Sequence, residues 1–430
     1  MRLKADKSEL SEREIGDVLS SARYLNYRRR KLKLKEYYNG EHAIRQKQGR
    51  ENAEANNKLV SNYASYITNI SVGFFLGQPI SYKVASELEK EFEPLREVYK
   101  YNDEAAHNVE LAEEAAICGE SYELLYLDED AQIRLTTVPA EEVVLVTDTT
   151  LEENIICAIR LFRVYDLNGY NYQEYADVYK ADEVRHYRYN YGALTFLNSE
   201  PNYFEEVPII EYPNNRQRRG DFEDVISLID AYNLTQSLSL DDLQDFTDAF
   251  LVLKNLHIYD DKQAQELRRR KIIEVDNDGA ASWLIKNLND TYIENLKKRL
   301  QGDIHKFSAV PDMSDDSFAS NASGVAIKYK LLGLEQIRAR KEREFKKALQ
   351  RRVELMGGVL KLKNLPAIDF RRVEVQFTAN IPANLQEVAQ VVTQLDGVVS
   401  QRTLLSLLPF IEDVSAEIKE LEGEENNESF

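Results

Sequence analysis

The sequence predicts an α+β protein built from several parts, on three observations. Apolar residues recur at helical spacing through most of residues 8–118 and again through residues 291–356. Between them, residues 121–197 alternate apolar and polar residues, as half-buried strands do. A short strand-rich stretch, residues 249–290, separates two helical segments. With 43% hydrophobic and 30% charged residues over 430 positions, the chain can bury more than one core.

The N-terminal part is expected to be mainly helical. A helix over residues 8–38 ends in the basic cluster RRRKLKLK at residues 28–35, and further helices are expected over residues 57–77, 86–99 and 103–118. The cluster is either a contact for phosphates or an acidic partner, or a solvated helix end that the helix dipole favours. We favour the second interpretation.

A β-rich module follows. Its strands are expected at residues 121–127, 133–138, 143–146, 155–165, 172–179, 184–191 and 194–197. Tyrosines crowd this module: Tyr165, Tyr170, Tyr172, Tyr175, Tyr179, Tyr187, Tyr189 and Tyr191. They could stack on nucleic-acid bases, but alternation on a half-buried sheet is the commoner cause of such a pattern. Pro208 and Pro213 are expected to mark a boundary.

An acidic helix is expected over residues 221–248, which contain eight Asp or Glu and no Lys or Arg. Its candidate site residues are Asp230, Asp241, Asp242, Asp245 and Asp248. The last four could bind divalent metal ions, as in nucleases, if histidines or further carboxylates faced them. The five histidines, His42, His107, His186, His257 and His305, show no such spacing. A solvated acidic face is therefore favoured, and no metal or cofactor is predicted.

The next segments are expected to be a small lobe, a helix, a loop and a very long helix. The lobe covers residues 249–290 and the helix residues 291–306, which Pro311 ends. A polar loop follows and contains Asp312, Met313, Ser314, Asp315, Asp316, Ser317, Phe318, Ala319, Ser320, Asn321, Ala322 and Ser323. Ser323 would cap a helix that continues without proline to about Met356.

The long helix is the most basic region of an acidic chain, with ten Lys or Arg against three Glu over residues 325–352. Its candidate contacts are Lys328, Lys330, Arg338 and Arg340. They could pair with the acidic helix of a neighbouring copy, be solvated, or meet DNA phosphates, and we favour the first. Gly333 is a candidate hinge, because glycine inside a helix costs about 1 kcal/mol relative to alanine.

The C-terminal part is expected to return one strand and then form small helices. The strand covers residues 372–377, and the helices residues 385–395, 400–408 and 415–421. The acidic tail, residues 420–430, should not pack.

Known catalytic patterns are missing from the sequence. It contains no GxxxxGK[ST], HExxH, GxSxG or GxGxxG motif, and its two cysteines match no CxxC pattern. No segment is long and apolar enough to span a membrane. The net charge of −19 argues against gripping nucleic acid over a wide surface, although DNA could still pass by. A non-enzymatic role is favoured, and a metal-dependent nuclease using residues 241–248 is the alternative.

Two stretches of sequence resemble the portal proteins of tailed double-stranded DNA bacteriophages, in the siphophage-type branch. One is SNASGVAIKYKLLGLEQ at residues 320–336, and the other is NKLVSNY at residues 57–63 with GFFLGQPI at residues 73–80. The resemblance implies a cyclic ring, twelve subunits in the family pattern, and the following division of the chain. Residues 1–220 would be the wing, 221–248 stem helix 1, 249–290 the clip, 291–310 stem helix 2, 311–324 the tunnel loop, 325–380 the long helix and returning wing strand, and 381–430 the helical crown with its acidic tail.

The resemblance also implies function and partners. The ring would form a channel at one capsid vertex through which double-stranded DNA is packaged and ejected. The acidic stem would line the channel and the tunnel loop, residues 312–323, would narrow it. The expected partners are the terminase large subunit, a head-completion or adaptor protein, and the major capsid and scaffold proteins. The chain would be part of the virion after assembly in the host cytoplasm, with no membrane contact.

Overall fold

The computed structural model describes most of the chain as two compact units. The described residues are 1–7, 9–49, 55–246, 250–254, 262, 272–275, 282–284, 290–314, 324–379, 385–405, 407–408, 411, 414 and 417–418. The first unit comprises Met1–Met313 with Leu331–Thr378, and the second comprises Ser314–Lys330 with Ala379–Phe430. Within the described residues, no helix is long and apolar enough to cross a membrane.

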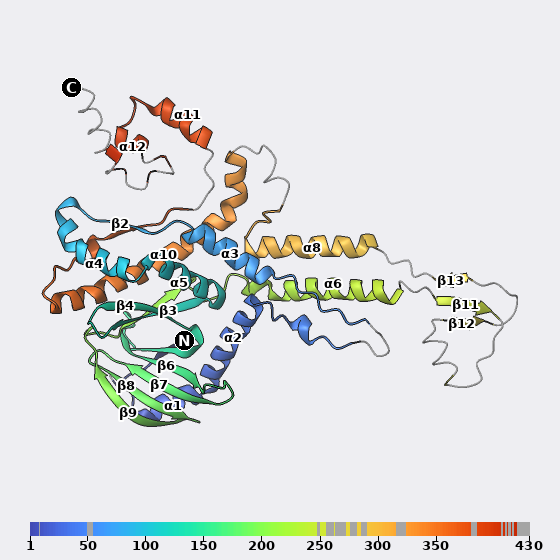
Figure 1. Ribbon diagram of the computed structural model, residues 1–430, viewed down its shortest axis with the longest axis horizontal. Helices are drawn as coiled ribbons and strands as arrows, with labels where there is room; N and C mark the ends of the chain where they lie inside the picture. The colour runs from blue at the N-terminus through green and yellow to red at the C-terminus, as the bar shows by residue number, and fades with distance from the viewer. Residues whose placement is uncertain are drawn as a thin grey trace. The chain divides into compact units, whose positions relative to one another are not determined.

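The larger sheet of the first unit has six strands in the order β1-β5-β6-β7-β8-β9 (Figure 1). They are β1 Arg2–Lys4, β5 Val143–Thr147, β6 Ile155–Tyr165, β7 Tyr172–Tyr179, β8 Glu183–Asn190 and β9 Ala193–Pro201. The expected strands are confirmed, but β1 was not predicted and β9 continues beyond its expected end at residue 197. Pairing with β8 holds the polar residues of β9 in the sheet, as the register Glu183↔Pro201 shows.

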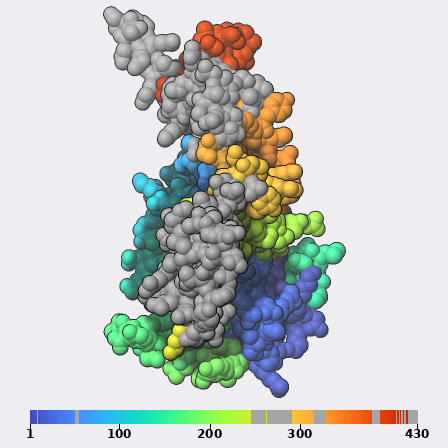
Figure 2. Space-filling model, turned by 90° about the vertical axis from the view of Figure 1, so that its right-hand side faces the viewer, coloured from blue at the N-terminus to red at the C-terminus, as the bar shows by residue number. Residues whose placement is uncertain are grey.

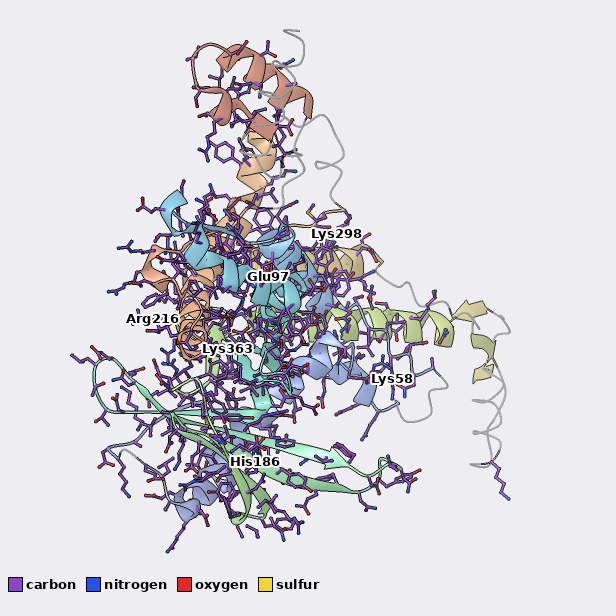
Figure 3. The ribbon with its side chains drawn as sticks, turned by 60° about the vertical axis from the view of Figure 1, so that its left-hand side comes forward. Lys58, Glu97, His186, Arg216, Lys298 and Lys363 are labelled. Carbon is purple, nitrogen blue, oxygen red and sulfur yellow. The ribbon has the colours of Figure 1, made fainter. Side chains whose placement is uncertain are left out.

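The side chains of the larger sheet explain part of its tyrosine content. Tyr179, Tyr187 and Tyr189 are buried, whereas Tyr170 and Tyr191 are exposed. His186 lies among these strands (Figure 3), where its Nδ1 is 2.7 Å from Asp177 Oδ1. Alternation on a half-buried sheet therefore accounts for the buried members of the set.

A second sheet has three strands in the order β10-β3-β4: β10 Ile209–Pro213, β3 Glu120–Leu127 and β4 Ile133–Val138. Strand β10, which lies at the boundary expected at Pro208 and Pro213, was not predicted, and it pairs along β3. Pro213 stands at a strand end, where proline is tolerated. The Pro208 carbonyl accepts a hydrogen bond from the Leu125 N–H at 2.9 Å.

The N-terminal helices differ from expectation at two places. The helix expected over residues 8–38 is split at Ser21 into α1 Glu12–Ser20 and α2 Ala22–Tyr38, because the Ser21 side chain accepts from the Tyr24 N–H and caps α2. The helix expected from residue 57 begins instead as α3 Tyr63–Leu76, capped by Asn62. The other helical elements are the short η1 Ala43–Gln46, η2 Ser86–Leu88 and η3 Ala140–Glu142, with α4 Glu89–Tyr101 and α5 Glu104–Cys118.

Two helices, α6 Ile226–Phe246 and α8 Asp290–Ser308, lie side by side (Figure 1). Figure 2 views the molecule from the right-hand side of Figure 1, so the pair is seen end-on, with the yellow atoms of α8 next to the yellow-green atoms of α6. The one-turn helix η4 Glu223–Val225 precedes α6. In the sequence, three strands lie between α6 and α8: β11 Phe250–Lys254, β12 Ile272–Val275 and β13 Ser282–Leu284. They form a sheet of order β12-β11-β13. The helix expected at residues 261–271 lies outside the described residues except for Lys262, which is helical.

The long helix is α10 Gly324–Leu362, with 39 residues. At about 1.5 Å per residue it is roughly 58 Å long. The expected end at Met356 is wrong, because Leu355, Val359 and Leu360 keep the helix packed in the main core beyond the Gly357-Gly358 pair. After η5 Phe370–Arg372, β14 Glu374–Gln376 pairs with β2 Ser81–Lys83, so the expected returning strand is present but shorter.

The second unit contains the C-terminal helices. α11 Leu385–Leu395 is as predicted, and α12 Gln401–Leu405 is shorter than the expected 400–408. Glu417 and Ile418 are helical, whereas the remainder of the helix expected at residues 415–421 and the acidic tail lie outside the described residues.

Candidate functional site

One face of α6 supports the segment that leads into α3. Three backbone N–H groups of this segment donate to α6 side chains: Asn57 to Asp241 Oδ1 at 2.6 Å, Leu59 to Ser237 Oγ at 2.9 Å, and Ser61 to Asn233 Oδ1 at 2.8 Å. We call this set the strap ladder. Its donors are alternate residues and its acceptors are four residues apart, in the opposite order along the chain.

Helix and strand geometry explain the spacing of the strap ladder. Two residues of extended chain advance about 6.6 Å, and four residues of helix advance about 6 Å, so the two repeats keep step over three rungs. The α6 acceptors are buried, with exposed fractions of 0% for Asn233 and Ser237 and 2% for Asp241. Each rung thus satisfies one backbone donor and one buried side chain.

A second layer of contacts fixes both ends of the strap ladder. At one end the Lys47 ammonium pairs with Asp241 Oδ2 and donates to the Asn57 carbonyl at 3.0 Å. At the other end the Asn233 amide donates to His42 Nδ1 at 2.8 Å, and His42 Nε2 lies 2.9 Å from the Tyr37 carbonyl. These partners place a proton on Nε2 rather than Nδ1. The ladder therefore joins α2, the segment at residues 57–61 (the strap) and α6 into one body.

The ladder changes the expected role of Asp241. Burial opposes ionisation of this carboxyl, but the hydrogen bonds from Lys47 and Asn57 outweigh it and lower the pKa of Asp241. Its side chain faces the interior of its own subunit, so the expectation that Asp241 lines a channel is wrong. The same contacts oppose a nuclease site, because both carboxylate oxygens are already engaged.

The other acidic candidates on this helix lie in different settings. Asp230 is half-buried and accepts from the Tyr37 hydroxyl at 3.0 Å. Burial and this carboxylate raise the pKa of Tyr37 to about 12. Asp242 is half-buried, Asp245 lies on α6 with an undescribed side chain, and Asp248 is outside the described residues. Of the five, Asp230 and Asp241 therefore serve contacts within the subunit.

The start of the polar loop after α8 is held by an aromatic cluster. The Tyr66 hydroxyl donates to the Pro311 carbonyl at 3.1 Å and accepts from the Met313 N–H at 2.9 Å. The His305 ring packs edge-on against Tyr66, with ring centroids 5.7 Å apart, and its Nδ1 lies 3.0 Å from the Val310 carbonyl. This Tyr66 clamp fixes the direction in which the chain leaves α8.

The loop candidates are described only at their first three positions. Asp312 is half-buried and accepts from the Gln301 side chain at 2.8 Å, whereas Met313 and Ser314 are exposed. The other candidates lie outside the described residues: Asp315, Asp316, Ser317, Phe318, Ala319, Ser320, Asn321, Ala322 and Ser323.

The basic candidates on α10 divide into two kinds. Lys328, Lys330 and Arg340 are exposed. Arg338 pairs with Glu335 at 2.9 Å and also with Glu342 on its own helix, so its charge is already used within the subunit. The interpretation that these cations face a neighbouring copy stays a prediction, although the charge of Arg338 is paired on its own helix.

Gly333 lies where α10 meets the end of α8. A Cβ added there would be 3.4 Å from both the Cβ and the carbonyl oxygen of Ala309. Ala309 itself has a φ of 55°, which belongs to the left-handed region. Gly333 thus permits a close approach between α10 and this turn, which is a reason for glycine that needs no hinge.

A buried ionic network holds α10 to the β-rich part, and the sequence analysis missed it. Arg352 has an exposed fraction of 0%. Its guanidinium donates to Glu123 at 3.0 Å, to Glu104 at 2.9 Å and to Asn108 at 2.9 Å. Glu123 also accepts from the Tyr212 hydroxyl at 2.7 Å. Glu104 and Asn108 lie one turn apart on α5, and this pair of polar residues was the signal in the sequence from which the network could have been predicted.

Charge compensation keeps the network ionised. Burial opposes ionisation of Glu123, but the Arg352 guanidinium and a hydrogen bond from His107 outweigh it and lower the pKa of Glu123 to about 2. His107 Nε2 is 2.8 Å from Glu123 Oε1. The network thus fixes the C-terminal half of α10 on α5, β3 and β10.

The basic cluster at residues 28–35 proves to be largely structural. Lys31 is fully buried and pairs with Glu120 at 2.9 Å, Arg30 pairs with Glu223 at 2.7 Å, and Lys35 pairs with Glu114 and Glu141. The interpretation as a solvated helix end is therefore wrong for these three cations, since each is used within the subunit.

One group of side chains in the described part of the chain has ligand atoms close enough for a metal ion: Glu114, Cys118 and Glu141. The Lys35 ammonium already bridges its carboxylates, at 2.8 Å from Glu114 and 2.7 Å from Glu141. Burial raises the pKa of the Cys118 thiol, which disfavours the thiolate that a metal binds. Lysine thus supplies the positive charge at this cluster.

Comparison with known proteins assigns the chain to a family. A family model described as "Phage portal protein, SPP1 Gp6-like" matches residues 20–429. The portal protein of Bacillus phage SPP1 is 27% identical over 328 residues, covering 70% of this chain and 63% of that protein. The chain's match thus spans less than two thirds of that relative's length. The portal protein of Clostridium phage phiCD119 is 23% identical over 421 residues, covering 89% and 90%.

Solved structures with a similar chain trace include particles of a gene transfer agent. The neck of the empty particle, computed with C6 symmetry, has a TM-score of 0.46 at 14% identity, covering 80% of this chain and 90% of that chain. The virion of the native particle has a TM-score of 0.44 at 12% identity, covering 80% and 89%. Because the family model covers nearly the whole sequence, this chain belongs to the SPP1 Gp6-like family of phage portal proteins.

Proposed function

We propose that this chain is a portal subunit, which closes into a ring at one capsid vertex and passes double-stranded DNA through its centre. The family match over residues 20–429 carries this proposal. The arrangement of α6, α8, the intervening small sheet and the long α10 supports it, because these elements follow one another as in the resembled family. The role is structural, and the ring has twelve subunits in the family pattern.

Within this ring, the helices α6 and α8 form the stem and residues 311–324 form the tunnel loop. The strap ladder fixes α6 to the segment before α3, and the Tyr66 clamp fixes the start of the tunnel loop. Such contacts would hold the channel wall in place while DNA passes. Asp242, Asp245 and Asp248 remain the acidic candidates for the channel surface. An acidic wall repels the phosphates of passing DNA, so the duplex slides without being held.

The partners follow from the same proposal. The small sheet β11–β13 with its surrounding segments, residues 249–290, is the docking site for the terminase large subunit, which supplies the energy for packaging. A head-completion or adaptor protein binds the ring after packaging, and the major capsid and scaffold proteins surround it. The ring becomes part of the virion after assembly in the host cytoplasm.

Gly333 is the proposed hinge of the tunnel loop, although its contact with Ala309 offers a simpler reason for glycine. Gly333→Ala stiffens the helix and adds a Cβ at 3.4 Å from Ala309. We expect the variant to assemble but to impair DNA packaging when it replaces the normal subunit in a phage. Normal packaging by Gly333→Ala rings would remove the hinge and leave only the close approach.

Mass measurement in solution tests the proposal against the nuclease alternative. We expect the purified chain to assemble into large closed rings and to leave linear DNA intact with or without Mg²⁺. A monomer or dimer that cuts DNA when Mg²⁺ is added would support the nuclease and overturn the portal. Asp241→Ala is the matched variant, since a nuclease would lose cleavage while a portal would lose only the ladder rung.

A further inference from the structure

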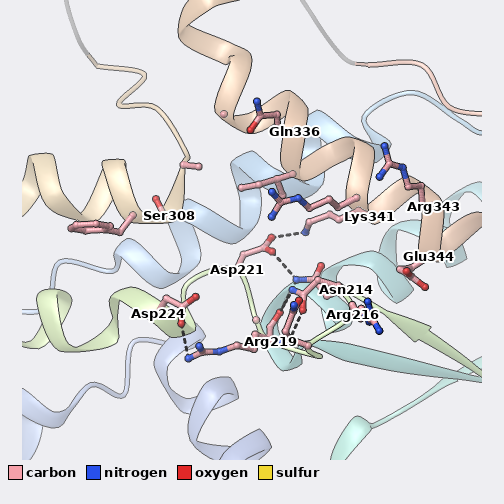
Figure 4. A pocket seen from close by; sticks show the side chains of 18 residues that line it. Asn214, Arg216, Arg219, Asp221, Asp224, Ser308, Gln336, Lys341, Arg343 and Glu344 are labelled. Carbon is pink, nitrogen blue, oxygen red and sulfur yellow. Dashed lines mark hydrogen bonds and ion pairs between the residues drawn. The ribbon is translucent and has the colours of Figure 1, made fainter.

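A basic cleft lies where α10 crosses the turn between β10 and α6, within the first unit. It has a volume of about 670 Å³ and is lined from three segments: the β10–α6 turn, the end of α8 and the middle of α10. Figure 4 shows the cleft with Arg216 and Arg343 at one side and Gln336 above. Gly333 and Ala309 also line the cleft, and a Cβ added at Gly333 would lie 3.4 Å from Ala309.

The carboxylates of the basic cleft are already neutralised. Asp221 pairs with Lys341 at 2.5 Å and also accepts from the Asn214 amide at 2.8 Å (Figure 4). Asp224 pairs with Arg219 at 2.5 Å. The remaining carboxylate, Glu344, pairs with Lys347 at 3.1 Å.

Three arginines of the basic cleft have no such partner. Arg216, Arg340 and Arg343 are exposed, and none of them forms an ion pair with a described residue. The cleft thus carries three uncompensated guanidinium groups on a chain whose net charge is −19. Guanidinium groups bind carboxylates and phosphates through paired N–H donors, so the occupant is an anion.

The exposed face of α10 continues from the basic cleft. Leu332, Gln336, Arg340, Arg343 and Lys347 are exposed at spacings of three and four residues, so they form one stripe along the helix. Leu332, with an exposed fraction of 51%, gives the stripe an apolar end. A stripe that is both apolar and cationic is better suited to bind a protein surface than to bind phosphate alone.

We propose that the basic cleft is a socket for carboxylates of the neighbouring copy in the ring. This inference rests on the proposed ring, in which one face of each subunit meets a different face of the next. The chain has 74 acidic and 55 basic residues, so a second copy offers a surplus of carboxylates to the three arginines. Of the acidic helix, Asp221, Asp224 and Asp241 pair within their own subunit, so other carboxylates enter the socket.

Nucleic acid is the less suited occupant. Affinity for duplex DNA grows with the number of phosphates that a protein neutralises, and three arginines in one cleft engage only a few. Charges that complement each other across a protein interface also fix which faces meet, which is what ring closure requires.

Charge reversal tests the socket in the full chain. We expect Arg340→Glu/Arg343→Glu to raise the concentration needed for half-assembly by about tenfold or more, because like charges would then face each other at every interface. The matched control is Lys100→Glu/Lys361→Glu, which changes the charge equally at exposed positions outside the cleft. Sedimentation over a range of concentrations measures both, and the control should assemble as the wild type does.

Crosslinking identifies the occupant directly. Arg340→Lys/Arg343→Lys keeps the charge but introduces amines, which a carbodiimide joins to nearby carboxylates. We expect crosslinks from these positions to a carboxylate of another copy, found by mass spectrometry of mixed isotope-labelled rings. Crosslinks confined to one subunit would overturn the socket.

The remaining outcomes separate the socket from the ring. If the reversal variant forms rings as readily as its control, the socket is wrong and the ring stands. If the reversal abolishes binding of a short DNA duplex but leaves assembly unchanged, nucleic acid occupies the cleft and the socket is wrong. A wild-type chain that never forms rings overturns both.

Discussion

Two helices of the first unit bury polar side chains in different ways. α6 presents Asn233, Ser237 and Asp241 to the backbone of a neighbouring segment, whereas α10 inserts the Arg352 guanidinium between the carboxylates of Glu104 and Glu123. Loss of a rung on α6 leaves one backbone donor unsatisfied. Loss of the cation on α10 leaves two buried negative charges. We therefore expect the partner, more than the polar group itself, to set the cost of removing each buried side chain.

Arg352→Met is expected to have the largest effect on stability. It keeps much of the side-chain volume but leaves Glu104 and Glu123 without their cation, which should cost about 3–5 kcal/mol. Thermal or denaturant unfolding measures the loss. The control is Arg351→Met on the same helix, whose pairs with Glu206 and Glu354 are partly exposed and should contribute about 0–1 kcal/mol. Equal losses in the two variants would contradict a special role for the buried network.

The pH dependence of unfolding sharpens the same contrast. The pKa of Glu123 is lowered from 4.5 to about 2 in the folded chain, so the stability it contributes is present above pH 4.5 and is lost as the pH falls toward 2. The contribution is on the order of 3 kcal/mol. Glu123→Gln should flatten this part of the pH profile. An unchanged slope between pH 4.5 and 2 would contradict the assignment.

Asp241→Ala is expected to have an intermediate effect. It removes the acceptor of the Asn57 N–H and the partner of Lys47, which should cost about 1–3 kcal/mol. Ser227→Ala, at an exposed position of the same helix, should stay within about 0.5 kcal/mol of the wild type. If Asp241 instead faced solvent, the two variants would unfold alike.

Tyr66→Phe is expected to act mainly locally, on the start of the polar loop after α8. It removes both hydrogen bonds of the Tyr66 clamp, each of which is worth about 0.5–1.5 kcal/mol. The Met313 amide should then exchange its hydrogen up to about tenfold faster, as measured by hydrogen exchange. Tyr101→Phe, at an exposed site, is the control. An unchanged Met313 rate would mean that other contacts hold the loop base.

The sequence predicts the elements of this chain well where they depend on apolar periodicity. The strands β4, β6 and β7 lie at their predicted residues, and the long helix follows directly from a proline-free run. The sequence-based prediction fails where a single local polar contact decides where a helix begins or ends. Ser21 and Asn62 each cap a helix and thereby split or shorten a segment whose apolar spacing alone continues.

The candidate site is harder to predict, because charge counts do not reveal pairing. Eight carboxylates within residues 221–248 predict an acidic face, yet Asp241 is buried against Lys47, which lies far away in the sequence. The four-residue spacing of Asn233, Ser237 and Asp241 is visible in the sequence. It indicates a ladder only when the structure shows that residues 57–61 run alongside it. The basic cluster at residues 28–35 is similar, since its carboxylate partners come from other segments.

Electron microscopy of the purified chain tests the central claim most directly. The account predicts particles with a closed ring of identical subunits and a central hole, and it predicts that the α6–α8 helix pair lies beside that hole. Isolated subunits at every concentration, or closed particles with no opening along their axis, would contradict it.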